Sequence, residues 1–105
     1  MMMIFSKKEE HVLKEEAERL GMGCFQTDNI YYFLRVAKEV KPEIVLMNFE
    51  KDFNNDPKIM TEIKGALCEN GVCPKIYLNK PEDFEGEEFF ENVDFEKEDV
   101  QKYLQ

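Results

Sequence analysis

Strand-sized runs of apolar residues alternate along this chain with longer segments whose apolar residues recur every three or four positions. The runs at Met2 to Phe5, within "PEIVLMNFE" (42–50) and within "PKIYLN" (74–79) are almost continuously apolar, as in strands buried on both faces of a sheet. The longer segments have the spacing of amphipathic helices. The pattern therefore predicts strands and helices in alternation.

The first helix is expected soon after the first strand. Ser6 and Glu9 have the spacing of a capping box, with Ser6 at the N-cap and Glu9 at the third helical position. Gly21 is expected to end this helix, because glycine is the usual residue just beyond a helix C-terminus. Its predicted buried stripe is Val12, Leu13, Ala17 and Leu20.

A second helix is expected between Asp28, which can cap it, and Lys41-Pro42, because the residue before a proline avoids the α region. Tyr31 and Tyr32 point in other directions than Phe33 at helical spacing, so we expect the tyrosines to be partly exposed. The predicted buried stripe is Ile30, Phe33, Leu34, Ala37 and Val40.

The third helix is expected to start at Asp56-Pro57, a capping residue followed by proline in the first turn, and to extend to Gly71. The remaining elements are less regular. They are a second strand in "GCFQT" (23–27), a third strand from Glu43 to Phe49, a fifth strand in "FFENV" (89–93), and a last helix from Glu96 to Leu104 with Val100, Tyr103 and Leu104 inward. The predicted buried stripe of the third helix is Ile59, Met60, Ile63 and Leu67.

Strands and helices that alternate at this spacing form right-handed βαβ units. We therefore predict one α/β domain over residues 1–105, a three-layer sandwich with a mostly parallel sheet that helices cover on both faces. Ligands of such sheets bind beyond the carboxyl ends of the strands. The residues to consider there are Ser6, Lys7, Asn48, Asn79 and Val93.

Composition supports a soluble protein, with 43% hydrophobic and 35% charged residues in a chain of 105. No apolar stretch is long enough to cross a membrane. Lys7 and Lys8 follow the apolar start of the chain, which is the wrong order for a signal peptide, so we expect a cytoplasmic protein.

Three cysteines without a CxxC pair, and a single histidine (His11), argue against a structural zinc site. Cys68 and Cys73 flank the expected end of the third helix. We expect both to be reduced thiols, at least one of them buried, as is usual in the cytoplasm. A redox pair is the alternative.

The negative charge of the chain is concentrated near its end. Ten of the 23 acidic residues, but only one of the 14 basic residues, lie between Glu82 and Asp99, so the rest of the chain carries 13 charges of each sign. Such a segment repels phosphates, and no basic stripe compensates for it elsewhere. We therefore expect no binding of nucleic acid.

The order and spacing of these elements resemble a response-regulator receiver domain of two-component signalling. "MMIFSKKEEHVLKEEAERLGM" (2–22) is similar to the first strand and helix of that family, "LRVAKEVKPEIVLMNF" (34–49) to the second helix and third strand, and "PKIYLNK" (74–80) to the fourth strand. The resemblance implies a flavodoxin-like fold with a five-stranded sheet in the order 2-1-3-4-5.

The active groups of receivers are missing from this chain. In the family, two acids after the first strand hold Mg²⁺, an aspartate at the end of the third strand accepts the phosphoryl group, and a hydroxyl and a lysine follow the fourth and fifth strands. Matched by position, Ser6 and Lys7 replace the acid pair, Asn48 the aspartate, Asn79 the hydroxyl and Val93 the lysine. None of the five groups is kept.

These substitutions have a direct chemical consequence. Mg²⁺ prefers anionic oxygens, whereas Lys7 brings a positive charge, and the Asn48 amide has no ionisable oxygen with which to attack phosphorus. We therefore predict no enzymatic activity, no metal and no cofactor. Lys7 has two possible positions: it lies near Glu50 and Asn48, in place of the cation, or it points into water.

Only 13 residues separate Asn79 from Val93, so the fourth helix of a receiver must be shortened or missing. In the family, this helix contributes to the usual partner surface. We expect a rebuilt surface of acidic and aromatic residues in its place, although the acids can equally be a solvated face over phenylalanines that belong to the core. The candidate interaction surface is Phe84, Glu87, Glu88, Phe89, Glu91 and Asp94.

The sequence thus favours a non-catalytic pseudo-receiver that acts as a protein-interaction or regulatory module in signal transduction. Its acidic segment would attract a basic or mixed protein partner, and a homodimer is also open. The alternative is a flavodoxin-like protein that binds a nucleotide or flavin, or a small enzyme of the same fold. "FSKKEEH" (5–11) lacks the glycines of a phosphate-binding loop, which weakens this alternative.

Overall fold

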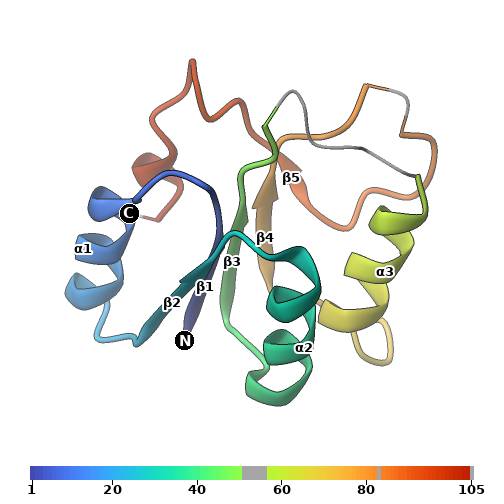
Figure 1. Cartoon of the computed structure of the whole chain (residues 1–105), viewed down its shortest axis with the longest axis horizontal. Coiled ribbons are helices and arrows are strands. Elements are labelled where there is room, and N and C mark those ends of the chain that lie inside the picture. The colour runs from blue at the N-terminus through green and yellow to red at the C-terminus, as the bar shows by residue number, and fades with distance from the viewer. Residues whose placement is uncertain (51–56, 83, 105) are drawn as a thin grey trace.

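The computed structural model describes residues 1–50, 57–82 and 84–104 and contains one five-stranded sheet. All its strand pairs are parallel, and the order β2-β1-β3-β4-β5 is that of a flavodoxin-like fold (Figure 1). The predicted fold class is therefore confirmed, with the sheet entirely parallel. The strands are β1 (Met2–Phe5), β2 (Cys24–Thr27), β3 (Ile44–Met47), β4 (Lys75–Leu78) and β5 (Glu91–Asn92).

Helices cover the sheet on both faces (Figure 1). One layer consists of α2 (Ile30–Val40) and α3 (Pro57–Leu67), which pack on the side chains of Met3 and Phe5 from β1. The other consists of α1 (His11–Arg19) and the short 3-10 helix η1 (Val100–Leu104), which pack on the alternate β1 residues Met2 and Ile4. Successive side chains of a strand point to opposite faces, so a continuously apolar strand supplies both cores.

The start of α1 differs from the predicted capping box. The helix begins at His11 after Glu10, and the Ser6 hydroxyl donates to Glu10 Oε1 at 2.9 Å instead of capping a helix that contains Glu9. Its C-terminal end is as expected, with Gly21 at a positive φ of 72°. Leu13 and Ala17 are buried as predicted, whereas Val12 and Leu20 are exposed, so the buried face of α1 is narrower than the predicted stripe.

Asn29, not Asp28, caps α2, and its side-chain oxygen accepts the backbone N–H of Tyr32 at 3.0 Å. The helix ends at Val40, which is exposed, and Lys41 has the left-handed conformation that the following proline permits. The α3 helix starts at Pro57 as predicted, whereas the expected cap Asp56 lies outside the described residues. It ends at Leu67, earlier than predicted. Apart from Val40, the predicted stripe residues of α2 and α3 are buried.

The C-terminal part of the fold is reduced. No helix lies among the described residues between β4 and β5 (79–82 and 84–90), and β5 has only two residues. The expected helix from Glu96 is limited to η1, because turns occupy 95–97 and the backbone becomes helical only at Val100. Val100 and Leu104 are buried as predicted, while Tyr103 is half-buried.

Cys68 and Cys73 form a disulfide, so the prediction of two reduced thiols is wrong for this pair. A tight turn at Asn70 and Gly71 brings them together. Cys24 is a free, exposed cysteine. Among the described helices, none has the length and apolar character needed to cross a bilayer.

Tyr77 of β4 and Tyr103 of η1, which pack against each other, give the fold a dependence on alkaline pH. The rings of Tyr77 and Tyr103 are 5.4 Å apart. Burial, followed by the charge of Glu91, raises the pKa of Tyr77, and burial, followed by the charges of Glu98 and Glu91, raises the pKa of Tyr103. A raised pKa means that the folded state holds these protons more tightly than the unfolded chain does. The stability that the two phenols contribute is complete below the ordinary tyrosine pKa of about 10, and it is lost as the pH rises through the raised pKa values of the folded state.

We therefore expect the free energy of unfolding to fall over the interval above about pH 10, as measured by urea denaturation. The variant Tyr77→Phe should lose less stability over this interval, because it lacks one of the two phenols with a raised pKa. Tyr31→Phe is the control at an exposed position, and its profile should follow that of the wild type. Identical profiles for all three proteins would contradict the prediction.

Candidate functional site

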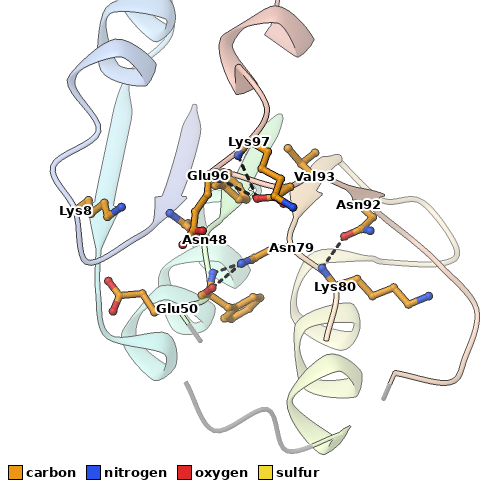
Figure 2. Close-up of a pocket in the computed structure, with 12 residues that line it drawn as sticks. Lys8, Asn48, Glu50, Asn79, Lys80, Asn92, Val93, Glu96 and Lys97 are labelled. Carbon is orange, nitrogen blue, oxygen red and sulfur yellow. Dashed lines mark hydrogen bonds between the residues drawn. The ribbon is translucent and has the colours of Figure 1, made fainter. Parts of the chain in front are cut away.

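A cleft of about 690 Å³ lies at the carboxyl ends of β3, β4 and β5 (Figure 2). This is the edge of the sheet at which ligands of parallel α/β proteins bind. Three segments form most of its walls, namely the residues after β3, the residues after β4, and the chain from the end of β5 toward η1, and Lys8 is added from the loop after β1. The lining residues are Lys8, Asn48, Phe49, Glu50, Asn79, Lys80, Asn92, Val93, Asp94, Phe95, Glu96 and Lys97.

Asn79, which the sequence resemblance matches to a hydroxyl, holds the backbone at the end of β3. Its Oδ1 accepts the backbone N–H of Phe49 at 2.8 Å, and its Nδ2 donates to the carbonyl of the same residue. The two bonds continue the β3–β4 pairing beyond the last paired residues, Met47 and Leu78. Both polar atoms of the Asn79 amide therefore serve the fold.

Amides also fix the loops beside the other strand ends. Asn92 Oδ1 accepts the backbone N–H of Lys80 at 2.7 Å, which ties the end of β5 to the residue after Asn79 (Figure 2). Gln26 in β2 donates through Nε2 to the carbonyls of Ser6 and Lys8. These side chains replace, at the strand ends, hydrogen bonds that the separating backbones no longer make.

Asn48 is the exception among these amides. It lies directly after β3, its backbone N–H donates to the carbonyl of Phe5 at 2.8 Å, and it is half-buried in the cleft. Among the described residues, none forms a hydrogen bond with its side chain. An uncharged amide can donate and accept hydrogen bonds, but it is neither a nucleophile nor a strong ligand for a hard cation.

The two residues after β1 do not line the cleft. Ser6 is buried, its hydroxyl donates to Glu10, and it also accepts the backbone N–H of Lys8 at 3.2 Å. Lys7 is half-exposed, with its Nζ 3.9 Å from Glu50 Oε2, so this lysine lies beside the carboxylate that follows Asn48. An ion pair this exposed contributes little to stability.

The cleft has no net formal charge, because Lys8, Lys80 and Lys97 are balanced by Glu50, Asp94 and Glu96. Some of these charges have partners. Lys80 Nζ lies 3.0 Å from Glu88, whereas no described residue forms an ion pair with Lys8 or Lys97. Within residues 1–50, 57–82 and 84–104, no three carboxylate, histidine or cysteine side chains are grouped so that they could hold a metal ion.

Asp94 organises the wall between β5 and η1. Its Oδ1 accepts the backbone N–H groups of Glu96 (3.0 Å) and Lys97 (3.3 Å) (Figure 2). Its own N–H donates to the Glu98 carboxylate at 2.9 Å. Asp94, which the sequence places on the interaction surface, is thus part of a turn. Val93, in the position of the receiver lysine, is buried and belongs to the core under α1.

The candidate interaction surface is divided between inward rings and outward acids. Phe84 and Phe89 are half-buried, and each packs against the ring of Phe90, at centroid distances of 5.8 and 5.1 Å. Glu87 is 3.7 Å from Lys64 of α3, and Glu88 pairs with Lys80. The acids at 82, 85 and 91 are exposed and form no ion pair with a described residue.

Several cleft residues are not among those that the sequence indicates. Lys80 follows Asn79 directly, so its place in the cleft could have been predicted from the end of β4. Asn92 is not among the candidates because it lies inside the expected strand 89–93. Lys8, Glu96 and Lys97 reach the cleft from loops of irregular shape. The sequence carries no periodic signal for the course of such loops.

Comparison with protein-family models, with curated proteins and with solved structures finds no match for this chain. The topology of the sheet establishes the flavodoxin-like arrangement. The geometry of the cleft is then the basis for any functional proposal.

Proposed function

We propose that this chain is a non-catalytic, receiver-like module that binds a protein partner in a regulatory pathway. The observation that carries the proposal is the use of amides at the strand ends. Where a receiver needs a hydroxyl for phosphate, Asn79 is bound at both polar atoms to the backbone of Phe49. Where a receiver needs a nucleophile, Asn48 has no ionisable oxygen.

The Lys7–Glu50 pair supports the same proposal. In receivers the loop after β1 supplies anionic oxygen for Mg²⁺, but here the Lys7 ammonium group lies 3.9 Å from the carboxylate oxygen of Glu50. A cation at this position would meet electrostatic repulsion. A module without phosphorylation transmits information through binding alone, so its partner surface carries the function.

The partner we propose has a basic surface. Glu82 and Glu85, in the segment between β4 and β5, and Glu91 in β5 are exposed, and none of them forms an ion pair with a described residue. A groove of about 670 Å³ runs beside β5 and is lined by Phe89, Phe90 and Glu91 among others. Apolar rings under a rim of carboxylates suit a partner that combines basic and apolar side chains.

Charge reversal tests this surface. The triple variant Glu82→Lys, Glu85→Lys, Glu91→Lys should reduce capture of the native partner from host extract at least tenfold at low salt, because attraction becomes repulsion. The matched control reverses three exposed acids elsewhere, Glu15, Glu18 and Glu39, and should retain the partner. Capture on immobilised protein with quantitative mass spectrometry measures both.

Equal loss of the partner in both triple variants, or binding that does not weaken with salt, would contradict a specific acidic interface. Incubation of the wild type with acetyl phosphate and Mg²⁺ provides a second test. We expect no added phosphoryl group in the intact mass. A phosphorylated side chain in this cleft would overturn the non-catalytic assignment.

The alternative, a small-molecule binding protein, is favoured by one observation. The cleft holds two lysines, Lys8 and Lys97, that pair with no described carboxylate, and the Asn48 amide, which forms no side-chain hydrogen bond with a described residue. These groups suit an anionic ligand such as a nucleotide. Native mass spectrometry of the protein isolated gently from its host distinguishes the two: a bound small mass supports this alternative, and an added polypeptide supports the interaction module.

A further inference from the structure

The segment between α3 and β4 is a small disulfide-closed hairpin. Glu69 and Val72 exchange both backbone hydrogen bonds, each at 2.9 Å, and form an isolated antiparallel bridge. Asn70 and Gly71 between them have φ values of 53° and 78°, as the two central residues of a type I′ turn require. Cys68 and Cys73 are the next pair outward and form the disulfide.

This hairpin brings the two sulfurs together by its own backbone geometry. The residues that flank a hydrogen-bonded pair form a non-hydrogen-bonded pair, whose Cα atoms approach most closely in an antiparallel ladder. Cys68 and Cys73 occupy such positions, with their Cα atoms 4.2 Å apart. The asparagine–glycine turn therefore holds the two thiols near each other whether or not they are joined.

We propose that the Cys68–Cys73 hairpin is a site of reversible thiol–disulfide exchange with a dithiol reductant. A thiolate of the reductant attacks one sulfur and forms a mixed disulfide, and its second thiol then releases the protein. The balance is two electrons and two protons: the protein disulfide becomes two thiols, and the reductant dithiol becomes a disulfide.

Three observations indicate exchange rather than a permanent staple. The cysteines are only five positions apart, so the bond closes a short loop and restricts the unfolded chain little. Both are half-buried and thus partly accessible to a reductant. They lie at the margin of the core under α2 and α3. The buried residues of this core form one cluster that does not include either cysteine. In a chain predicted to be cytoplasmic, a disulfide of this kind is usually transient.

Reduction would change a second surface. This surface lies at the amino ends of the strands, whereas the cleft lies at their carboxyl ends. The hairpin forms one wall of a hollow of about 640 Å³ between the C-terminal ends of α2 and α3, lined by Lys38 and both cysteines. Glu69 of the hairpin lies 3.3 Å from Lys41, the residue that ends α2. Reduction replaces the disulfide in the wall of this hollow with two thiols, which the asparagine–glycine turn keeps close together.

The test is a redox titration of the folded protein in the variant Cys24→Ser, which removes the remaining thiol. The protein is equilibrated with mixtures of reduced and oxidised glutathione, the free thiols are alkylated, and intact mass gives the reduced fraction. We expect reversible interconversion across the cytosolic range of glutathione mixtures, with unchanged far-ultraviolet circular dichroism. Changes in hydrogen exchange should be confined to the hairpin and the end of α2.

A pair of glycine variants tests the role of the turn. Gly71→Ala places a Cβ at positive φ and should lower the equilibrium constant for disulfide formation about fivefold. Gly65→Ala, in α3 with open space around the new Cβ, should leave that constant unchanged. A disulfide that resists glutathione until the protein unfolds, or a fold that melts when the bond opens, would overturn the proposal and make the bond structural.

Discussion

Replacement of Phe33 by alanine should lower the free energy of unfolding by about 3–5 kcal/mol, the largest stability effect that we expect from one substitution outside the strands. The Phe33 ring is fully buried in the core under α2 and α3 and makes an edge-to-face contact with Phe5 at 6.0 Å. Its removal leaves a cavity between α2 and β1 that rigid strands cannot fill. Urea denaturation followed by circular dichroism measures the loss.

The matched control is Tyr31→Ala, two residues earlier in the same helix. The Tyr31 side chain is 74% exposed, so its removal costs little burial, and the change to alanine favours the helix. We expect a change of less than about 0.5 kcal/mol. Losses of similar size for Phe33→Ala and Tyr31→Ala would mean that α2 packs on the sheet with a different face.

Replacement of Asn79 by alanine should destabilise the fold by about 2 kcal/mol, because two hydrogen bonds to the Phe49 backbone are lost in a partly buried place. The effect should be local as well as global. Backbone amide exchange of Phe49 should accelerate more than that of Leu46 in the middle of β3. Hydrogen exchange by NMR measures both.

Asn48→Ala is the control for this prediction. Asn48 is also an asparagine directly after a strand, but its side chain forms no hydrogen bond with a described residue. Its loss should be less than about 0.5 kcal/mol. Asn79→Asp adds a further distinction, because a carboxylate can accept the Phe49 N–H but cannot donate to its carbonyl. Equal stability of the Asn48 and Asn79 alanine variants would contradict the assigned structural role of Asn79.

The fold class could be predicted from the sequence because burial on two faces leaves a strong pattern. "MMIF", "IVLM" and "KIYL" correspond to β1, β3 and β4, and the helical stripes of α2 and α3 are buried almost as predicted. Strands without exposed faces require helices on both sides, and right-handed connections then limit the possible topologies. The receiver resemblance supplied the strand order.

The ends of the helices were predicted less well, because capping groups have competing partners. Ser6 has the correct spacing for a capping box with Glu9, yet its hydroxyl donates to Glu10. Gln26, distant in sequence, donates to the carbonyls of Ser6 and Lys8, and the chain between β1 and α1 is not helical before His11. A local rule cannot include an amide from another strand.

Local sequence determined the fold class of this protein, the strand ends where its cleft lies and the absence of the receiver's acids. Tertiary structure alone decided what each strand-end residue does there. Asn48 and Asn79 each directly follow a strand, but the Asn79 amide is bonded at both polar atoms to the backbone of Phe49, whereas no described residue forms a hydrogen bond with the Asn48 side chain. Likewise, the turn at Asn70 and Gly71 joins Cys68 to Cys73. Hydrophobic patterns record burial, whereas hydrogen bonds depend on which atoms the fold brings face to face.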